Sequence, residues 1–183
     1  RDEDRIRAYL GNADGTLTPR PPFTVTDAPN HIALARFDAD ADLDLAFTSS
    51  TTEGGKIHLN NGAGTFVFQS TFSTPVANAL LVLDVNNDGL SDAATNFSGS
   101  VAVLVNSGNG ILNTQLLTSV PGSSAGMAAE DVNGDGRMDI AVTRPAASRV
   151  QLLLNHGGGP FTAGPEVVTP PAPRRVAFAN VSG

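Results

Sequence analysis

The sequence predicts an all-β fold, a β-propeller of four-stranded antiparallel blades, because two unrelated markers recur in step along the chain. The first is the closing aspartate of an Asp-rich segment, at Asp44, Asp92 and Asp139, with intervals of 48 and 47 residues. The second is an Asn/Gly turn that begins near residues 11, 60, 106 and 155, with intervals of 49, 46 and 49. Four-stranded units at a period of 40 to 50 residues are typical of propeller blades.

Short apolar runs with a period of two residues fill each repeat, and turn residues separate them, which indicates strands and not helices. In the second repeat we expect strands at about 32–37, 43–48, 56–59 and 65–71. The Asp-rich loop joins the first two of these strands, and the Asn/Gly turn joins the last two. Because turns of successive antiparallel hairpins alternate between the two ends of a blade, these two connections lie on one face.

The repeats divide residues 1–183 into a single propeller region of about four blade equivalents. We expect a blade part at 1–26, full blades at 27–74, 75–121 and 122–169, and a partial blade at 170–183. Either a longer parent chain or a second copy of this chain, as a homo-oligomer, could complete the ring.

Composition narrows the classes of partner. The net charge is -7, with 18 acids against 11 bases, which argues against nucleic acid because phosphate binding requires clustered Lys and Arg. Ten of the acids fall in the three Asp-rich segments, where a cation could neutralise them. There is no cysteine, no apolar run long enough to span a membrane, and no apolar signal region in the first residues.

Two of the Asp-rich loops have a complete set of oxygen donors for calcium, which prefers six to eight carboxylate, amide and backbone oxygens. Side chains at alternate positions of a tightly curved loop can point to one centre, and a glycine such as Gly136 permits the sharp turn. Leu90 and Arg137 would contribute their backbone oxygens. The predicted ligands, for two calcium ions, are Asp84, Asn86, Asp88, Leu90 and Asp92 in one loop and Asp131, Asn133, Asp135, Arg137 and Asp139 in the other.

Two other interpretations of these loops agree less well with the sequence. An EF-hand requires Glu at the twelfth loop position and flanking helices, whereas Thr95 and Val142 stand there and both flanks are strands. A turn without an ion would leave converging carboxylates to repel one another.

The first Asp-rich loop, Asp38 to Asp44, departs from this pattern. Its first ligand position is Arg36 and its turn glycine is replaced by Ala41, although Asp38, Asp40 and Asp44 are present. One hypothesis places the Arg36 guanidinium among these carboxylates instead of calcium. The alternative is a weaker ion site in a shifted register.

The string from Glu130 to Val142, Glu-Asp-Val-Asn-Gly-Asp-Gly-Arg-Met-Asp-Ile-Ala-Val, resembles the FG-GAP or VCBS repeat of integrin α-chain propellers, secreted bacterial proteins and integrin-like lectins. The resemblance implies a calcium-binding propeller whose ligands bind on the face away from the metal loops or between blades. It also implies a secreted, extracellular or cell-surface location, and it assigns the metal positions to the two complete loops.

These observations favour a non-catalytic binding or adhesion module that recognises carbohydrate, as a lectin does, or an extracellular protein. The alternative is an accessory or structural propeller domain of a larger secreted enzyme. Catalysis within the chain is not expected, because His31, His58 and His156 fall in different parts of the repeat and no nucleophile or phosphate-loop motif is present. Candidate contact residues on the face opposite the metal loops are His31, Glu53, Asn96, Arg144 and Arg149.

Overall fold

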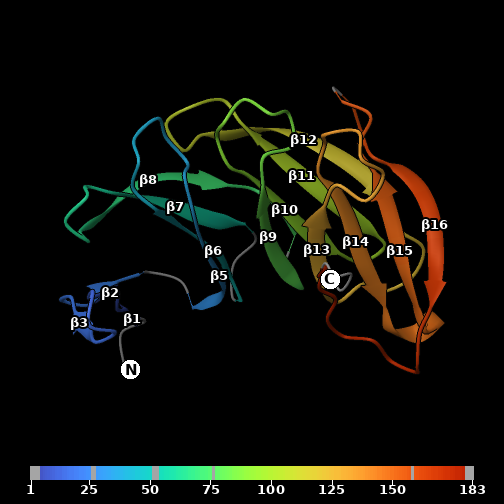
Figure 1. Ribbon diagram of the computed structural model, residues 1–183, viewed down its shortest axis with the longest axis horizontal. Coiled ribbons are helices and arrows are strands. Elements are labelled where there is room, and N and C mark those ends of the chain that lie inside the picture. Colours follow the sequence, from blue (N-terminus) through green and yellow to red (C-terminus); the bar gives the residue numbers. More distant parts are fainter. Residues whose placement is uncertain (1–4, 26–27, 51–53, 76, 158, 180–183) are drawn as a thin grey trace.

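The computed structural model describes residues 5–25, 28–50, 54–75, 77–157 and 159–179. Within them, three antiparallel sheets of four strands follow one another along the chain (Figure 1). Each sheet pairs its strands in sequence order, as in a meander. The first blade is formed by β5 (Pro29–Ala35), β6 (Asp44–Ser49), β7 (Gly55–Asn60) and β8 (Phe66–Phe72).

The second and third blades repeat this order. The second contains β9 (Ala79–Leu83), β10 (Asp92–Phe97), β11 (Ser100–Asn106) and β12 (Leu112–Ser119). The third contains β13 (Met127–Glu130), β14 (Asp139–Arg144), β15 (Arg149–Leu154) and β16 (Thr162–Val168), with a 3-10 turn, η1 (Pro145–Ala147), between β14 and β15.

An N-terminal hairpin, residues 5–25, precedes the first blade. Strand β1 (Arg5–Ile6) pairs with β4 (Phe23–Thr24), and β2 (Tyr9–Gly11) pairs with β3 (Leu17–Pro19). The hairpin packs against the first blade, since Ile6, Phe23 and Val25 share an apolar cluster with Phe47 and Phe66. No strand is found in the described residues that follow β16.

The blades stand side by side in an open arc (Figure 1). The first strand of the second blade, β9, contacts both β5 and β13, so the first strands of the three blades line the inner side of the arc. The arrangement is propeller-like and not closed. The predicted all-β fold of four-stranded antiparallel blades is confirmed.

Strand boundaries differ slightly from the sequence prediction, most clearly at Phe37, which lies outside β5. Its backbone N–H donates to the Asp44 carboxylate at 2.8 Å and therefore cannot extend the strand ladder. The chain leaves the sheet two residues early to form the Asp loop.

The core lies between the blades, because each middle strand presents alternate residues to the two neighbouring blades. In β10, Ala93 joins a cluster with Phe37 and Ile57 of the first blade, whereas Ala94 joins a cluster with Ile140 and Val142 of the third. Phe37 and Phe161 are buried in these clusters. Phe47 is buried in the cluster next to the hairpin, and Phe66 packs against that cluster. No helix among the described residues is long and apolar enough to cross a membrane.

Candidate functional site

The third Asp loop, residues 131–138, is held in a curved shape by its own side chains. The Asp131 carboxylate accepts hydrogen bonds from the backbone N–H groups of Gly134 and Gly136, both at 2.8 Å. The N–H of Asp135 lies 2.9 Å from the Asn133 side-chain oxygen, and the Asp135 carboxylate accepts from Arg137 N–H at 2.9 Å. Donation by Gly136 is the main reason why the pKa of Asp131 lies below its ordinary value. These bonds curve the loop, but its three carboxylates, unlike those of the first Asp loop, do not all lie within 4.8 Å of one another.

The second Asp loop, residues 84–91, has the same construction. The Asp84 carboxylate accepts from Gly89 N–H at 2.8 Å, and the Asp88 carboxylate accepts from Leu90 N–H at 2.8 Å. The Asn86 amide donates to the other Asp88 oxygen at 2.8 Å. The predicted ligand atoms in these two loops are hard oxygens, the type of ligand that calcium prefers.

The closing aspartate of each loop is fully buried and joins two turns of its own blade. In the second blade, one Asp92 oxygen accepts from Val85 N–H at 2.8 Å and the other accepts from Asn106 N–H at 2.7 Å. Asp44 and Asp139 make the equivalent pairs of bonds. Burial raises the pKa of Asp92 to about 6, although both hydrogen bonds oppose the shift. The closing aspartates therefore connect the Asp loop of each blade to its Asn/Gly turn. In the second and third loops, the sequence pattern also predicts them as calcium ligands.

In the first Asp loop, residues 36–43, the structure does not show the predicted exchange of calcium for Arg36. Arg36 is exposed, and among the described residues it forms no ion pair with the neighbouring carboxylates. Oxygens of Asp38, Asp40 and Asp44 instead lie within 4.8 Å of one another, close enough to hold one metal ion together. The donor set of this loop fits a hard cation as well as the donor sets of the other two loops do.

The Asn/Gly turn has a role that its sequence pattern did not reveal. The amide nitrogen of Asn106 donates to Phe37 O of the first blade at 2.9 Å, and that of Asn155 donates to Val85 O of the second blade at 2.9 Å. Each asparagine also donates within its own blade, to Ser91 O and Met138 O respectively. The recurring asparagine thus ties the second and third blades each to the preceding one, whereas the Asn60 amide nitrogen donates within its own blade. Its recurrence at the blade period was the only sign of this role in the sequence.

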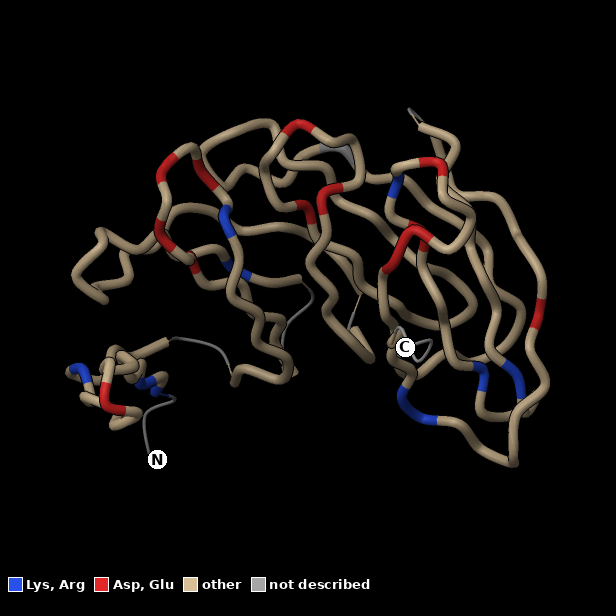
Figure 2. Tube along the Cα trace, viewed as in Figure 1, with Lys and Arg blue, Asp and Glu red and all other residues tan. Residues whose placement is uncertain are grey.

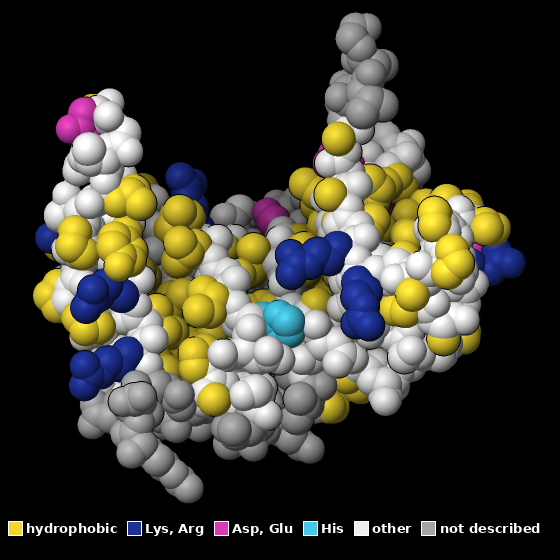
Figure 3. All heavy atoms as spheres, turned by 90° about the horizontal axis from the view of Figure 1, so that it is seen from below, with side chains coloured by type: hydrophobic (Ala, Val, Ile, Leu, Met, Phe, Trp, Pro, Cys, Tyr) yellow, Lys and Arg dark blue, Asp and Glu magenta, His cyan; other side chains and the backbone are white. Residues whose placement is uncertain are grey.

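Charge is divided between the two faces of the arc. Acidic residues gather in the Asp loops along the top of the view, whereas the lower end of the third blade and the segment after it contain basic residues (Figure 2). Seen from below, a histidine lies beside basic side chains near the middle of this face (Figure 3). We call this side, opposite the Asp loops, the connector face.

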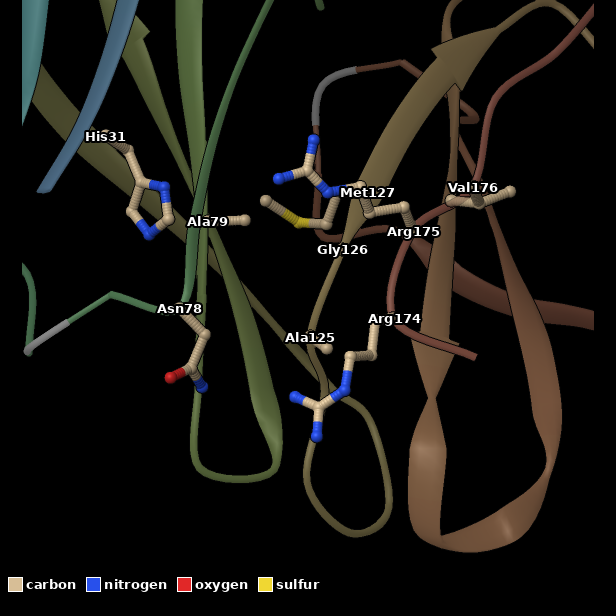
Figure 4. Close-up of a pocket in the computed structure, with 9 residues that line it drawn as sticks. All are labelled: His31, Asn78, Ala79, Ala125, Gly126, Met127, Arg174, Arg175 and Val176. Carbon is tan, nitrogen blue, oxygen red and sulfur yellow. The ribbon is translucent and has the colours of Figure 1, made fainter. Parts of the chain in front are cut away.

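A pocket of about 350 Å³ opens on the connector face, where the first strands of the blades begin. His31 and Asn78 lie on one side of this central pocket and Arg174 and Arg175 on the other (Figure 4). Burial, followed by the charge of Arg175, lowers the pKa of His31. The remaining lining residues are Ala79, Ala125, Gly126, Met127 and Val176.

A second pocket, of about 300 Å³, lies between the N-terminal hairpin and the first blade and is called here the hairpin pocket. It is lined by Thr24, Val25, Lys56, His58 and Phe68. The Phe68 ring is 54% exposed, whereas His58 is buried and its Nδ1 has no hydrogen-bond partner in the described part of the chain. Burial is the main cause of the lowered pKa of His58, and Lys56 adds to it.

The predicted contact residues separate into different environments. His31 lines the central pocket, but Asn96 is fully buried and its amide donates to Ala125 O at 3.1 Å, which suits a structural role. Arg144 and Arg149 both pair with Glu166. Glu53 lies outside the described residues.

Sequence reasoning did not identify Arg174, Arg175 or Asn78 as site residues, nor the hairpin-pocket residues Lys56 and Phe68. A usable signal existed for Arg175. It stands at the same repeat position as His31, Ala79 and Gly126, which lie near the start of the first strand of each described blade.

Comparison with known proteins supports the repeat organisation. A model described as an FG-GAP-like repeat matches residues 36–95, 84–142 and 131–183. No protein of curated function matches the sequence. Among solved structures, the chain is similar to a lectin from Agrocybe aegerita, described as recognising non-reducing terminal N-acetylglucosamine, with a TM-score of 0.63 and 21% identity over 90% of this chain and 46% of the lectin. It also matches a Photorhabdus luminescens Tc holotoxin pore with a TM-score of 0.40 and 22% identity, over 92% of this chain and 8% of that one. The chain thus spans about half the length of the lectin.

Proposed function

The chain belongs to the FG-GAP-like repeat family. We propose that it is a non-catalytic binding module that holds calcium in its Asp loops and recognises carbohydrate at the pocket between the N-terminal hairpin and the first blade. The observation that carries the carbohydrate part is the composition of the hairpin pocket. At 21% identity, the similarity to the lectin concerns the fold alone. The proposed ligand class therefore rests on the chemistry of this pocket.

The residues for calcium are those of the second and third Asp loops, with the first loop as a further candidate. Hydrogen bonds from loop N–H groups to the Asp84 and Asp131 carboxylates already hold these two loops in a curved shape. Bound calcium would supply the positive charge that relieves repulsion among these carboxylates. The chain itself provides the rest of the stiffness, through the closing aspartates and the asparagines that link neighbouring blades.

The hairpin pocket combines the two kinds of group that a neutral sugar needs. The half-exposed Phe68 ring offers a flat apolar surface for the C–H face of a pyranose, and ligand pockets generally combine such surfaces with a few polar groups. The hydroxyl of the exposed Thr24 lines the pocket and can meet a sugar hydroxyl group. The Nδ1 of His58 has no partner among the described residues but is itself buried, so a sugar hydroxyl reaches it only if the ring shifts.

A glycan array with the calcium-loaded protein tests this proposal, followed by calorimetric titration of the best neutral glycan. Phe68→Ala is expected to weaken binding about tenfold or more, since it removes the stacking surface. Val67→Ala is the matched control, because Val67 is 60% exposed on the same strand and does not line the pocket. Absence of any glycan signal from folded, calcium-loaded protein would sink the proposal, as would equal losses in the two variants. Capture of an extracellular protein without any glycan signal would favour protein recognition instead.

A further inference from the structure

We propose that the central pocket is a second binding site, and that it takes the carboxylate or sulfate group of an acidic saccharide. The pocket lies on the connector face, away from the Asp loops and from the hairpin pocket. The anionic part of this inference stands by itself, whereas the saccharide part rests on the proposed carbohydrate function.

The pocket is assembled from one position of four successive repeats. His31, Ala79, Gly126 and Arg175 are equivalent in the repeat and all line it. The two middle positions carry the smallest side chains and leave the space open, whereas the outer positions carry groups that can hold an anion. Convergence of these four positions follows from the arc, in which the starts of the first strands lie next to one another.

Gly126 shows that the segment with the arginines is closely fitted to the third blade. A Cβ added to Gly126 would come within 2.5 Å of Arg174 O and 3.0 Å of Arg175 Cα. Such distances to backbone atoms leave no room for any side chain at this position. The backbone of residues 174–175 is thereby held against the start of β13, and the two guanidinium groups are positioned at the pocket.

In the part of the chain that the structure describes, the positive charge in the pocket has no counterion. Among the described residues, neither Arg174 nor Arg175 forms an ion pair, whereas Arg144 and Arg149 share Glu166 and Arg137 pairs with Asp135. No acidic side chain of the described residues lines the pocket. Planar guanidinium groups match carboxylate and sulfate oxygens in geometry.

The size and the remaining lining favour a saccharide over a lone inorganic anion. A volume of about 350 Å³ is in the range of small-molecule sites and exceeds the needs of one sulfate ion. The Asn78 amide nitrogen is used by Ser124 O at 3.3 Å, which leaves its side-chain oxygen to accept from a ligand hydroxyl. Of the described residues that line the pocket, only His31 has an aromatic ring. A neutral sugar would therefore lack a large stacking surface, and the anionic group would have to supply the affinity.

Calorimetric titration of the calcium-loaded chain with glucuronic acid, glucose and inorganic sulfate tests the proposal. Glucuronic acid is expected to bind at least tenfold more tightly than glucose, and Arg174→Gln or Arg175→Gln is expected to weaken its binding by about tenfold. Arg36→Gln is the matched control, because it removes the same charge at the Asp-loop side of the first blade, where the side chain is exposed and forms no ion pair with described residues.

Four results would overturn the proposal. If glucuronic acid and glucose bind equally and the two pocket variants change neither, the site lies elsewhere, while carbohydrate binding that depends on Phe68 would still stand. If sulfate binds as tightly as glucuronic acid, the pocket is a free-anion site and the saccharide assignment is wrong. If an acidic peptide binds more tightly than glucuronic acid and competes with it, the ligand class is peptide. Loss of glucuronic acid binding in Phe68→Ala but not in Arg175→Gln would assign that binding to the hairpin pocket.

Discussion

The amide nitrogen of Asn106 lies 2.9 Å from the carbonyl oxygen of Phe37, so a side chain of the second blade is hydrogen-bonded to the backbone of the first. Gly110 N–H donates to the same oxygen at 2.6 Å. Asn155 makes the equivalent contact with Val85 O. The blades are therefore joined by directional bonds as well as by the apolar core between them.

Removal of this link is expected to destabilise the fold. Asn106→Ala leaves Ser91 O without its amide donor, takes one donor from Phe37 O, and should lower the free energy of unfolding by about 2–3 kcal/mol. Asn60→Ala is the matched control, because the described contacts of the Asn60 amide nitrogen stay within its own blade, at Leu43 O. Its expected loss is about 1 kcal/mol smaller. Urea unfolding followed by circular dichroism measures both variants, and equal losses would show that the inter-blade bond contributes nothing to stability.

Calcium removal is expected to lower the thermal stability of the chain. Carboxylates that a cation had neutralised would repel one another, and a ligand that binds only the folded state stabilises it by about 2.7 kcal/mol per site at a hundredfold excess over Kd. The measurement is a melting curve in chelator, then with calcium restored. Asp88→Asn with Asp135→Asn should abolish most of the response. If Asp38→Asn with Asp40→Asn also reduces it, the first loop holds an ion as well, and an unchanged melting curve in excess chelator would contradict metal binding altogether.

The raised pKa of Asp92 predicts a pH dependence in the calcium-free protein. Its pKa rises from 3.8 to about 6 on folding, so the folded state binds the proton more tightly than the unfolded state does. The resulting stability is fully present below about pH 4 and is lost as the pH rises through 6, with a maximum effect of about 3 kcal/mol. The pKa of Asp131 is shifted the other way, so that carboxyl stays ionised in this window.

Chemical unfolding in chelator between pH 4 and pH 7 tests this dependence. Asp92→Asn is expected to flatten the decrease in stability toward neutral pH, because the amide does not titrate. A parallel decrease in the wild type and the variant would assign the effect to other groups.

His31 predicts that anion binding to the central pocket strengthens in mild acid. Its pKa lies below 6.5 because the ring is partly buried and faces Arg175, and the other charged group at the pocket is Arg174. A bound anion favours the protonated ring, so the affinity for glucuronic acid should rise as the pH falls from 7.5 to 5, a range in which the ligand carboxylate stays ionised. His31→Gln should bind with little pH dependence. Titrations at these two pH values check this, and an equal rise in the variant would exclude His31 as the cause.

Local sequence patterns were sufficient to predict the strands. Alternation with a period of two residues set the strands close to their observed bounds, and the spacing of Asp44, Asp92 and Asp139 set the repeat. The curvature of the second and third Asp loops also follows from nearby residues, since Asp84 and Asp131 bond N–H groups at most five positions away. The hypothesis that the Arg36 guanidinium lies among the carboxylates of the first loop is not supported, because a position in the repeat pattern does not fix the direction of a side chain. The side chain stands at the first ligand position of its loop, but it is exposed to solvent.

The sequence by itself determined the blade, because strand pairing within a hairpin, turn geometry and loop curvature depend on residues close together in the chain. Only the tertiary structure decided which side chains meet between blades. Asn106 reaches Phe37, and Arg174 and Arg175 come to the pocket of His31, because whole blades pack against one another through the core between them. The packing of one blade on the next depends on side-chain volumes summed over many strands, which no single motif records.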